Sequence, residues 1–303
     1  MKVLDLIFAA RPMLHLPLWS IYLVCLHYHY ALSGESFGWS NVIMLACLSL
    51  VASGAYYVNQ VYDFESDRIN DKVGFLQKGY LSERNLMAAH LVTSIAAIAM
   101  SFCFRPVTVF IILQMYFLGF LYSVPPFRLK DRPIYGLLVN MWGIGFLTAF
   151  SVMPGIGFHN AGYLGWDNPF YFAFAVGGSY ILTTIPDREG DCRAGKCTIA
   201  VWIGRSGAIV CALVLGLASL RVAYKSGFPW LMAVAGVACI LTAASLMSRS
   251  EKVLLRAIKL PILLVSLLAG YFYPGYLLFM IALLVCTRLY YRKRFGVTYP
   301  RLT

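Results

Sequence analysis

The stretch SNVIMLACLSLVASGAYYVNQVY, residues 40–62, holds 23 residues without a charged side chain and runs directly into Asp63. An apolar run of about 20 residues is what an α-helix needs to cross about 30 Å of hydrocarbon. The segment therefore predicts a transmembrane helix that ends at an acidic residue.

Apolar runs of similar length recur along the whole chain. The final two runs are separated only by Tyr273 and Pro274. They form either a tight helical hairpin or one broken helix, so nine spans are the alternative to ten. We predict ten spans, over roughly residues 13–32, 40–62, 84–103, 106–123, 134–153, 168–186, 206–224, 229–248, 254–272 and 274–291.

Composition agrees with a membrane protein. Of the 303 residues, 60% are hydrophobic and only 13% are charged, and the mean hydropathy is +0.72. A soluble domain carries about a quarter charged residues. We predict one polytopic, all-α integral membrane domain over residues 1–303, with the first eleven residues as an interfacial lead-in.

The basic residues predict the orientation. If the N-terminus is cytoplasmic, 22 of the 25 Lys and Arg residues fall in inside segments, and only Arg105, Arg221 and Lys225 lie outside. This distribution follows the positive-inside rule. We therefore assign the net charge of +12 to topology and anionic lipid, expect no nucleic-acid partner, and place the protein in the cell membrane.

The first acidic patch follows the quoted span. Asn59, Asp63 and Asp67 are spaced four residues apart, so on a helix they form one stripe with neighbours about 5–6 Å apart. Two carboxylates and an amide oxygen are hard oxygen ligands that suit Mg²⁺. Like charges one turn apart at a membrane boundary are unfavourable unless a cation joins them.

The second acidic patch repeats this spacing. Asp187 and Asp191 follow the predicted span 168–186, with Pro186 at the boundary. Four crossings separate the two patches, so both lie on the same side of the membrane. Mg²⁺ binds few protein carboxylates and keeps other positions for water or phosphate oxygens. Two facing acidic pairs therefore suggest several ions bridged by a diphosphate at the cytoplasmic face.

A basic loop, Tyr122 to Arg132, lies on that same side. Its Pro125-Pro126 pair predicts a stiff, extended segment. Arg128 and Lys130 are candidates to bind diphosphate oxygens and stabilise departing charge. The aromatic faces of Tyr62 and Tyr122 are candidates to stabilise a carbocation.

These residues together resemble the UbiA superfamily of intramembrane prenyltransferases. Asn59-x₃-Asp63-x₃-Asp67 is similar to that family's first aspartate-rich motif. The stretch from Asp187 through Asp191, Gly195, Lys196 and Thr198, with Gly204 following, is similar to the second. Tyr122 with Lys130 resembles the loop between them.

The resemblance implies nine to ten transmembrane helices ringed around a central cavity, and transfer of an isoprenyl group from an isoprenyl diphosphate to a hydrophobic acceptor. It implies Mg²⁺ held through Asn59, Asp63, Asp67, Asp187 and Asp191. It also implies catalytic roles for these four aspartates, Lys130 and Tyr122, and diphosphate contacts from Asn59, Lys130, Arg68, Arg188, Lys196 and Arg11. One departure is the stretch Lys72 to Gly79, which lacks the prolines usual in the family, so that Lys78 is a substitute contact.

Three questions stay open on sequence alone. The acceptor is an aromatic quinone precursor, a glycerophosphate ether lipid or a tetrapyrrole, and we favour the aromatic one because no further basic cluster is dedicated to a second phosphate. A CDP-alcohol phosphotransferase would carry its acids in one continuous cluster. A cation-coupled transporter would place them near mid-membrane, and neither pattern occurs here.

Overall fold

The computed structural model describes residues 2–34, 36–69, 74–152 and 164–300, and within these ranges every regular element is helical. Ten long helical segments coincide with the ten predicted spans. They are α2 (Leu16–Ser33), α3 (Trp39–Tyr62), α5 (Glu83–Ser101), α6 (Pro106–Ser123), the continuous α7-η3-α8 segment (Pro133–Val139, Asn140–Leu147, Thr148–Phe150), α9 (Leu164–Thr183), α11 (Ile199–Lys225), α12 (Pro229–Met247), α13 (Glu251–Phe272) and α14 (Pro274–Phe295).

Within the described ranges, eight helical stretches are long and apolar enough to cross a membrane; α5 and α9 are not among them. The predicted all-helical membrane fold is confirmed. Tyr273, with φ −131° and ψ 86°, separates α13 from α14, so the last two predicted spans are two helices. Whether all ten segments cross the bilayer stays a prediction.

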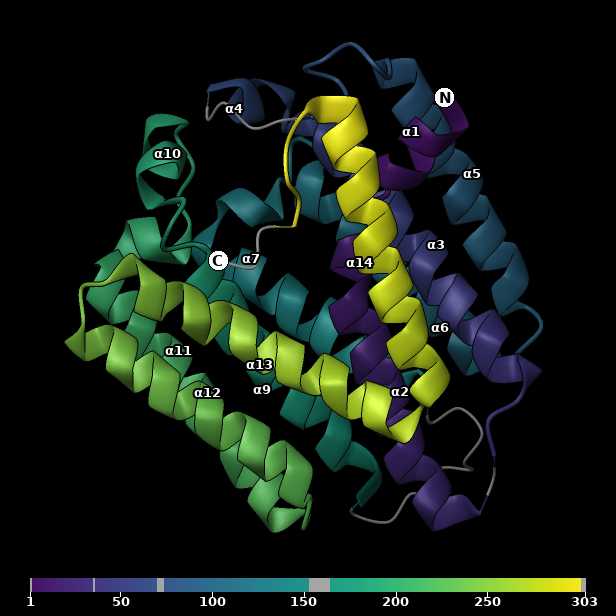
Figure 1. The fold of residues 1–303 in the computed structure, drawn as a ribbon, viewed down its shortest axis with the longest axis vertical. Coiled ribbons are helices and arrows are strands. Elements are labelled where there is room, and N and C mark those ends of the chain that lie inside the picture. The colour runs from purple at the N-terminus through teal and green to yellow at the C-terminus, as the bar shows by residue number, and fades with distance from the viewer. Residues whose placement is uncertain (1, 35, 70–73, 153–163, 301–303) are drawn as a thin grey trace.

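The long helices form a ring in which neighbours in space follow a simple order. Starting at α3, the ring passes through α6, the α7-η3-α8 segment, α9, α11, α12 and α13, and returns through α2. The helix α5 packs outside α3 and α6, and α14 lies across α13 (Figure 1). This arrangement confirms the ring expected from the family resemblance.

The segment that follows α6 contains a π-helical stretch, η3, packed closely against α9. At Gly145 a β-carbon would lie 2.6 Å from the Cα of Ala173 and 2.6 Å from the carbonyl oxygen of Phe172. These are backbone atoms that cannot yield, so only glycine allows this approach. Small residues at helix interfaces serve the same purpose in membrane proteins generally.

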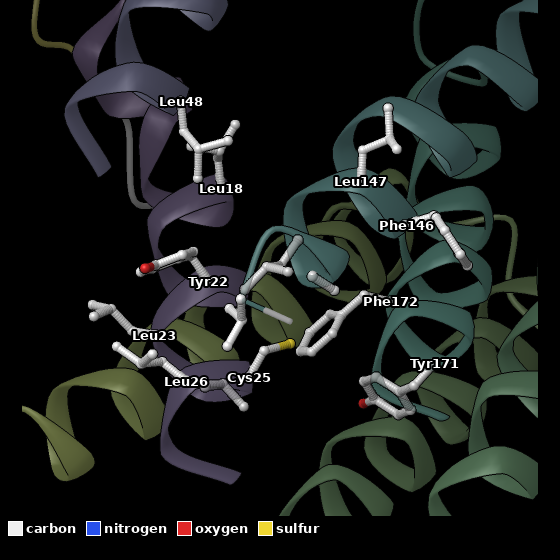
Figure 2. Close-up of a cluster of buried hydrophobic side chains, with 14 of the residues drawn as sticks. Leu18, Tyr22, Leu23, Cys25, Leu26, Leu48, Phe146, Leu147, Tyr171 and Phe172 are labelled. Carbon is white, nitrogen blue, oxygen red and sulfur yellow. The ribbon is translucent and has the colours of Figure 1, made fainter. Parts of the chain in front are cut away.

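The largest cluster of buried hydrophobic side chains joins several helices of the ring, and Figure 2 shows part of it. Tyr22 and Leu26 of α2 lie in it with Phe146 of η3 and Phe172 of α9. Phe172 stands eleven residues before the end of α9 at Thr183, which is about 16 Å at the rise of an α-helix. This part of the core therefore lies well away from the acidic patch that follows α9, and a smaller cluster with Ile181 and Ile185 lies next to that patch.

Short helices occupy the other end. They are α1 (Lys2–Ala9), the 3₁₀ turn η1 (Pro12–His15), α4 (Phe64–Ile69), the 3₁₀ turn η2 (Leu129–Asp131) and α10 (Arg188–Arg193). Figure 1 shows α4, α10 and α1 in the upper part of the molecule. Val3 and Ile7 of α1 are exposed whereas Asp5 is buried, so α1 presents one apolar face outward, as an interfacial lead-in would.

Candidate functional site

The first acidic patch keeps a helical register although its helix is interrupted. The helix α3 ends at Tyr62, and α4 begins at Phe64. The backbone N–H of Asp63 donates to the carbonyl of Asn59 at 2.9 Å, and the N–H of Asp67 donates to that of Asp63 at 2.8 Å. The predicted four-residue repeat is therefore built into the backbone.

Lys130 connects the basic loop to this patch. Its Nζ lies 2.7 Å from Oδ1 of Asp63 and donates to Oδ1 of Asn59 at 2.9 Å. The hydroxyl of Ser123, at the end of α6, donates to the same Asn59 oxygen at 3.0 Å. Lys130 and Asp63 are each only 8% exposed, so this is a buried ion pair with a shared amide acceptor.

The second acidic patch reaches the same point through Lys196. Its Nζ lies 3.3 Å from Oδ1 of Asp63. The N–H of Lys196 donates to the carbonyl of Asp191 at 2.9 Å, and the Thr198 hydroxyl donates to Oδ2 of Asp191 at 3.3 Å. The two acidic patches, 120 residues apart in the chain, therefore face one compartment.

The basic loop and the second patch are also joined by the backbone. The N–H of Cys197 donates to the carbonyl of Asp131 at 3.0 Å. Nε of Arg128 lies 2.9 Å from Oδ2 of Asp131, and Arg128 has a left-handed backbone with φ 39°. All three sequence patches thus contribute to one charged cluster around Asp63.

The electrostatics of this cluster favour charged side chains. Burial alone raises the pKa of Asp63, but Lys130 and Lys196 outweigh it and hold the pKa below its ordinary value. Burial lowers the pKa of Lys130, and Asp63 opposes that shift. Each charge depends on its partner because a buried charge without one is strongly unfavourable.

A second polar group sits beside this cluster. The Tyr122 side chain lies close to the side chains of Asn140 and Tyr180, and Asn140 donates to the carbonyl of Gly136 at 2.8 Å. Sequence reasoning selected Tyr122 but missed Asn140, Tyr180 and Ser123. Asn140 could have been selected from the sequence, because it is the only residue with a side-chain amide in the predicted span 134–153.

The structure gives other surroundings for three predicted diphosphate contacts, Arg68, Arg188 and Arg11. Arg68 is exposed and pairs with Glu65 at 2.8 Å, and Arg188 is exposed on α10. Arg11 has a left-handed backbone with φ 54°, and its charge opposes the burial that raises the pKa of Tyr299. Their roles stay predictions.

Of the predicted metal ligands, Asn59 and Asp63 meet at Lys130, and Lys196 links Asp63 to the backbone of Asp191. In the part of the chain that the structure describes, no three His, Cys, Asp or Glu side chains gather closely enough to hold an ion by themselves. The amide oxygen of Asn59 and the carboxylate of Asp63 nevertheless converge on one cation, the Lys130 ammonium. An incomplete set of oxygen donors of this kind fits Mg²⁺, which fills its remaining positions with water or phosphate oxygens.

The fold and the site together define an all-helical membrane protein with a charged cluster around the buried Lys130 and Asp63. The UbiA prenyltransferase family matches residues 18–259, and the chain belongs to this family.

Solved structures share the fold. A UbiA homolog from Archaeoglobus fulgidus bound to GPP and Mg2+ superimposes with a TM-score of 0.68 at 18% identity, covering 90% of this chain and 99% of that one. A UbiA homolog from Aeropyrum pernix K1 gives a TM-score of 0.63 at 17% identity, covering 86% and 98%.

Curated relatives differ in their named activities. Homogentisate solanesyltransferase of Arabidopsis thaliana is 29% identical over 55% of this chain and 46% of its own length. Digeranylgeranylglyceryl phosphate synthase of Pyrococcus furiosus is 31% identical over 54% of this chain and 57% of its own length. The chain spans less than half the length of the plant relatives that it matches.

Proposed function

We propose that this protein transfers an isoprenyl group from an isoprenyl diphosphate to a hydrophobic acceptor within the membrane. The main support for the proposal is the contact of two lysines with one carboxylate. Lys130 and Lys196, which come from distant parts of the chain, both lie close to Oδ1 of Asp63. Together with family membership, this cluster supports a site for a diphosphate rather than a solvated acidic surface.

The lysines have a defined task in this proposal. Diphosphate leaves readily only when its developing charge is neutralised, and preorganised cations do this without further rearrangement. Lys130 is preorganised because Asn59 and Asp63 hold its ammonium. Lys196 is held through the backbone hydrogen bond to Asp191.

The acidic residues have the complementary task. Asn59, Asp63, Asp67, Asp187 and Asp191 would hold Mg²⁺ in the proposed site. When bound, Mg²⁺ neutralises charge on phosphate oxygens. The depressed pKa of Asp63 keeps this carboxylate ionised over the whole physiological range, so that it stays available as a ligand.

The apolar ring and its aromatic side chains complete the proposal. Tyr122, which lies beside Asn140 and Tyr180, would face the allylic carbon as positive charge develops there. The buried core beyond it excludes water that would otherwise capture the cation. The site lies at the cytoplasmic face if the positive-inside orientation holds.

The acceptor that we propose is aromatic. The second candidate is a glycerophosphate ether lipid, because a relative with 31% identity is named for such a product. A panel containing an aromatic acid, a glycerophosphate ether lipid and a tetrapyrrole, each with geranyl and geranylgeranyl diphosphate, separates the candidates.

The direct test is release of diphosphate and formation of prenylated product by purified protein in lipid. We expect activity that requires Mg²⁺ and that falls by about 100-fold or more in Asp63→Ala, Asp67→Ala and Asp191→Ala. Glu65→Ala is the matched control, because Glu65 is exposed and pairs with Arg68 on the surface. Full activity in a variant lacking both Asp63 and Asp67 would overturn the proposal.

A further inference from the structure

The helix α1 contains a buried carboxylate that belongs to neither acidic patch. Asp5 is only 1% exposed. Arg294, near the end of α14, donates from Nε to Oδ1 and from Nη2 to Oδ2, both at 2.9 Å. The hydroxyl of Tyr290 also donates to Oδ1 of Asp5. A bidentate pair of this kind between a guanidinium and a carboxylate fixes the relative orientation of the two side chains as well as pairing their charges.

The same arginine holds the segment that follows the first acidic patch. Its guanidinium carbon lies 3.5 Å from the ring centroid of Tyr80, and the Tyr80 hydroxyl donates to the Arg294 carbonyl at 3.1 Å. The ring of Phe75 contacts that of Phe295 edge-on, with centroids 5.1 Å apart. In this way the end of α14 fixes the described residues 74–81.

The helix α1 in turn holds the last turns of α3. Nε2 of Gln60 donates to the Ala9 carbonyl at 2.7 Å, and the Tyr57 hydroxyl donates to the Leu6 carbonyl at 3.0 Å. Gln60 is buried and directly follows Asn59. The backbone that presents Asn59 and Asp63 is therefore anchored on one side by α1.

These contacts form one connected path from α14 through α1 to the first acidic patch. We infer that Asp5 and Arg294, with Tyr80 and Tyr290, form a buttress that positions Asn59 and Asp63 for Lys130 and for the diphosphate. The inference rests on the proposed function of that patch. Asp5 and Arg294 are positioning residues, because they act through α1 and α3. Both lie outside the stretch 18–259 that the family matches.

Hydrogen–deuterium exchange of the protein in detergent or nanodiscs tests the buttress without requiring activity. In Arg294→Ala the buried Asp5 loses its charge partner, so we expect exchange in residues 56–69 and 74–82 to speed up by about tenfold or more. Peptides from α11 and α12 should exchange as in the wild type. Arg292→Ala is the matched control, because Arg292 is exposed on the same helix and its loss changes the charge equally.

Kinetics separate positioning from a general loss of fold. A positioning role predicts that Arg294→Ala raises the KM for isoprenyl diphosphate several-fold. Arg294→Lys keeps the charge but loses the bidentate geometry, so its KM should lie between those of the wild type and Arg294→Ala. A purely structural role would lower only the active fraction and leave KM unchanged. Should Arg294→Ala fail to fold, Tyr290→Phe provides a milder version of the same test.

The outcomes distinguish this inference from the proposed function. Unchanged exchange at residues 56–69 in both Arg294→Ala and Asp5→Asn would overturn the buttress while leaving prenyl transfer intact. Absence of prenyl transfer by the wild type would overturn the proposed function, and faster exchange in the variants would still establish the path from α14 to α3.

Discussion

At the scale of single residues, the site depends on Lys130, which contacts the side-chain oxygens of two of the three residues that the sequence singled out in the first acidic patch, Asn59 and Asp63. Its ammonium is held by Asp63 and Asn59 in a buried position. Truncation removes a cation and leaves Asp63 with Lys196 as its remaining lysine partner. A guanidinium is larger and planar, so it does not reproduce the point contact of an ammonium.

We therefore expect Lys130→Met to reduce turnover by about 100-fold or more, and Lys130→Arg to recover only part of it. Initial rates of diphosphate release, with the amount of folded protein checked by size-exclusion chromatography, measure the effect. Lys252→Met is the control, because Lys252 is exposed at the start of α13. Equal rates for Lys130→Met and Lys252→Met would contradict a role for Lys130 in the reaction.

The residues of the charged cluster were largely predictable, for a physical reason. Acidic and basic side chains are rare in an apolar chain, so Asp63, Lys130 and Asp191 stood out by type and spacing. Ser123 and Tyr180 did not, because hydroxyl-bearing side chains are common in membrane helices. Their contacts depend on how α6 and α9 are rotated in the ring, which a sequence without packing information does not specify.

At the scale of elements, the close contact between η3 and α9 depends on one glycine. A β-carbon at position 145 would overlap backbone atoms of Phe172 and Ala173. The helices would have to separate, and overpacking of this kind costs about 1–3 kcal/mol.

We expect Gly145→Ala to lower the thermal unfolding midpoint in detergent by several degrees, consistent with a loss of about 1–3 kcal/mol. Gly236→Ala is the control, since a β-carbon there meets nothing within 4 Å. That control should change stability by no more than about 1 kcal/mol and in the stabilising direction. A similar loss in both variants would show that the η3–α9 contact is not the cause.

A second glycine sits where α11 bends. Gly204 has φ 74° and ψ 174° inside α11, a conformation that is essentially restricted to glycine and costs other residues about 1–3 kcal/mol. The bend separates residues 199–203, which follow Lys196 and Thr198, from the rest of the helix. It also explains why α11 starts at Ile199 although the apolar pattern predicted a span from 206.

We expect Gly204→Ala to lower the rate of prenyl transfer by a larger fraction than it lowers thermal stability. The strain that a side chain introduces at this position is relieved by displacement of the segment that holds Lys196. Parallel measurement of turnover and unfolding midpoint checks this. A variant that loses stability and activity in the same proportion would instead place the effect in general folding.

At the scale of the whole molecule, helix number and order were predictable because hydropathy reports directly on span length. The break at Tyr273 answers the question that the sequence left open, whether the last two runs are separate helices. The role of α1 was not foreseen, since a short apolar stretch carrying Asp5 gives no sign that Arg294 will meet it. A contact between residues so distant in the chain has no local signal.

Topology gives the test at this scale. In a background in which the eight cysteines are replaced by serine, a membrane-impermeant maleimide added to intact cells should label Arg105→Cys and leave Ser82→Cys unlabelled. Both positions are exposed, at opposite ends of α5. The reverse pattern would place the acidic patches on the outer face and contradict the positive-inside assignment.

Because Asp5 pairs with Arg294, we expect α1 and α14 to behave as one structural unit. Truncation of α1 or of α14 would break the same contacts. The losses of stability from the two truncations should therefore not be additive, which a double-mutant cycle would measure. An internal loop such as the one between α12 and α13, away from these contacts, is the safer place for a tag.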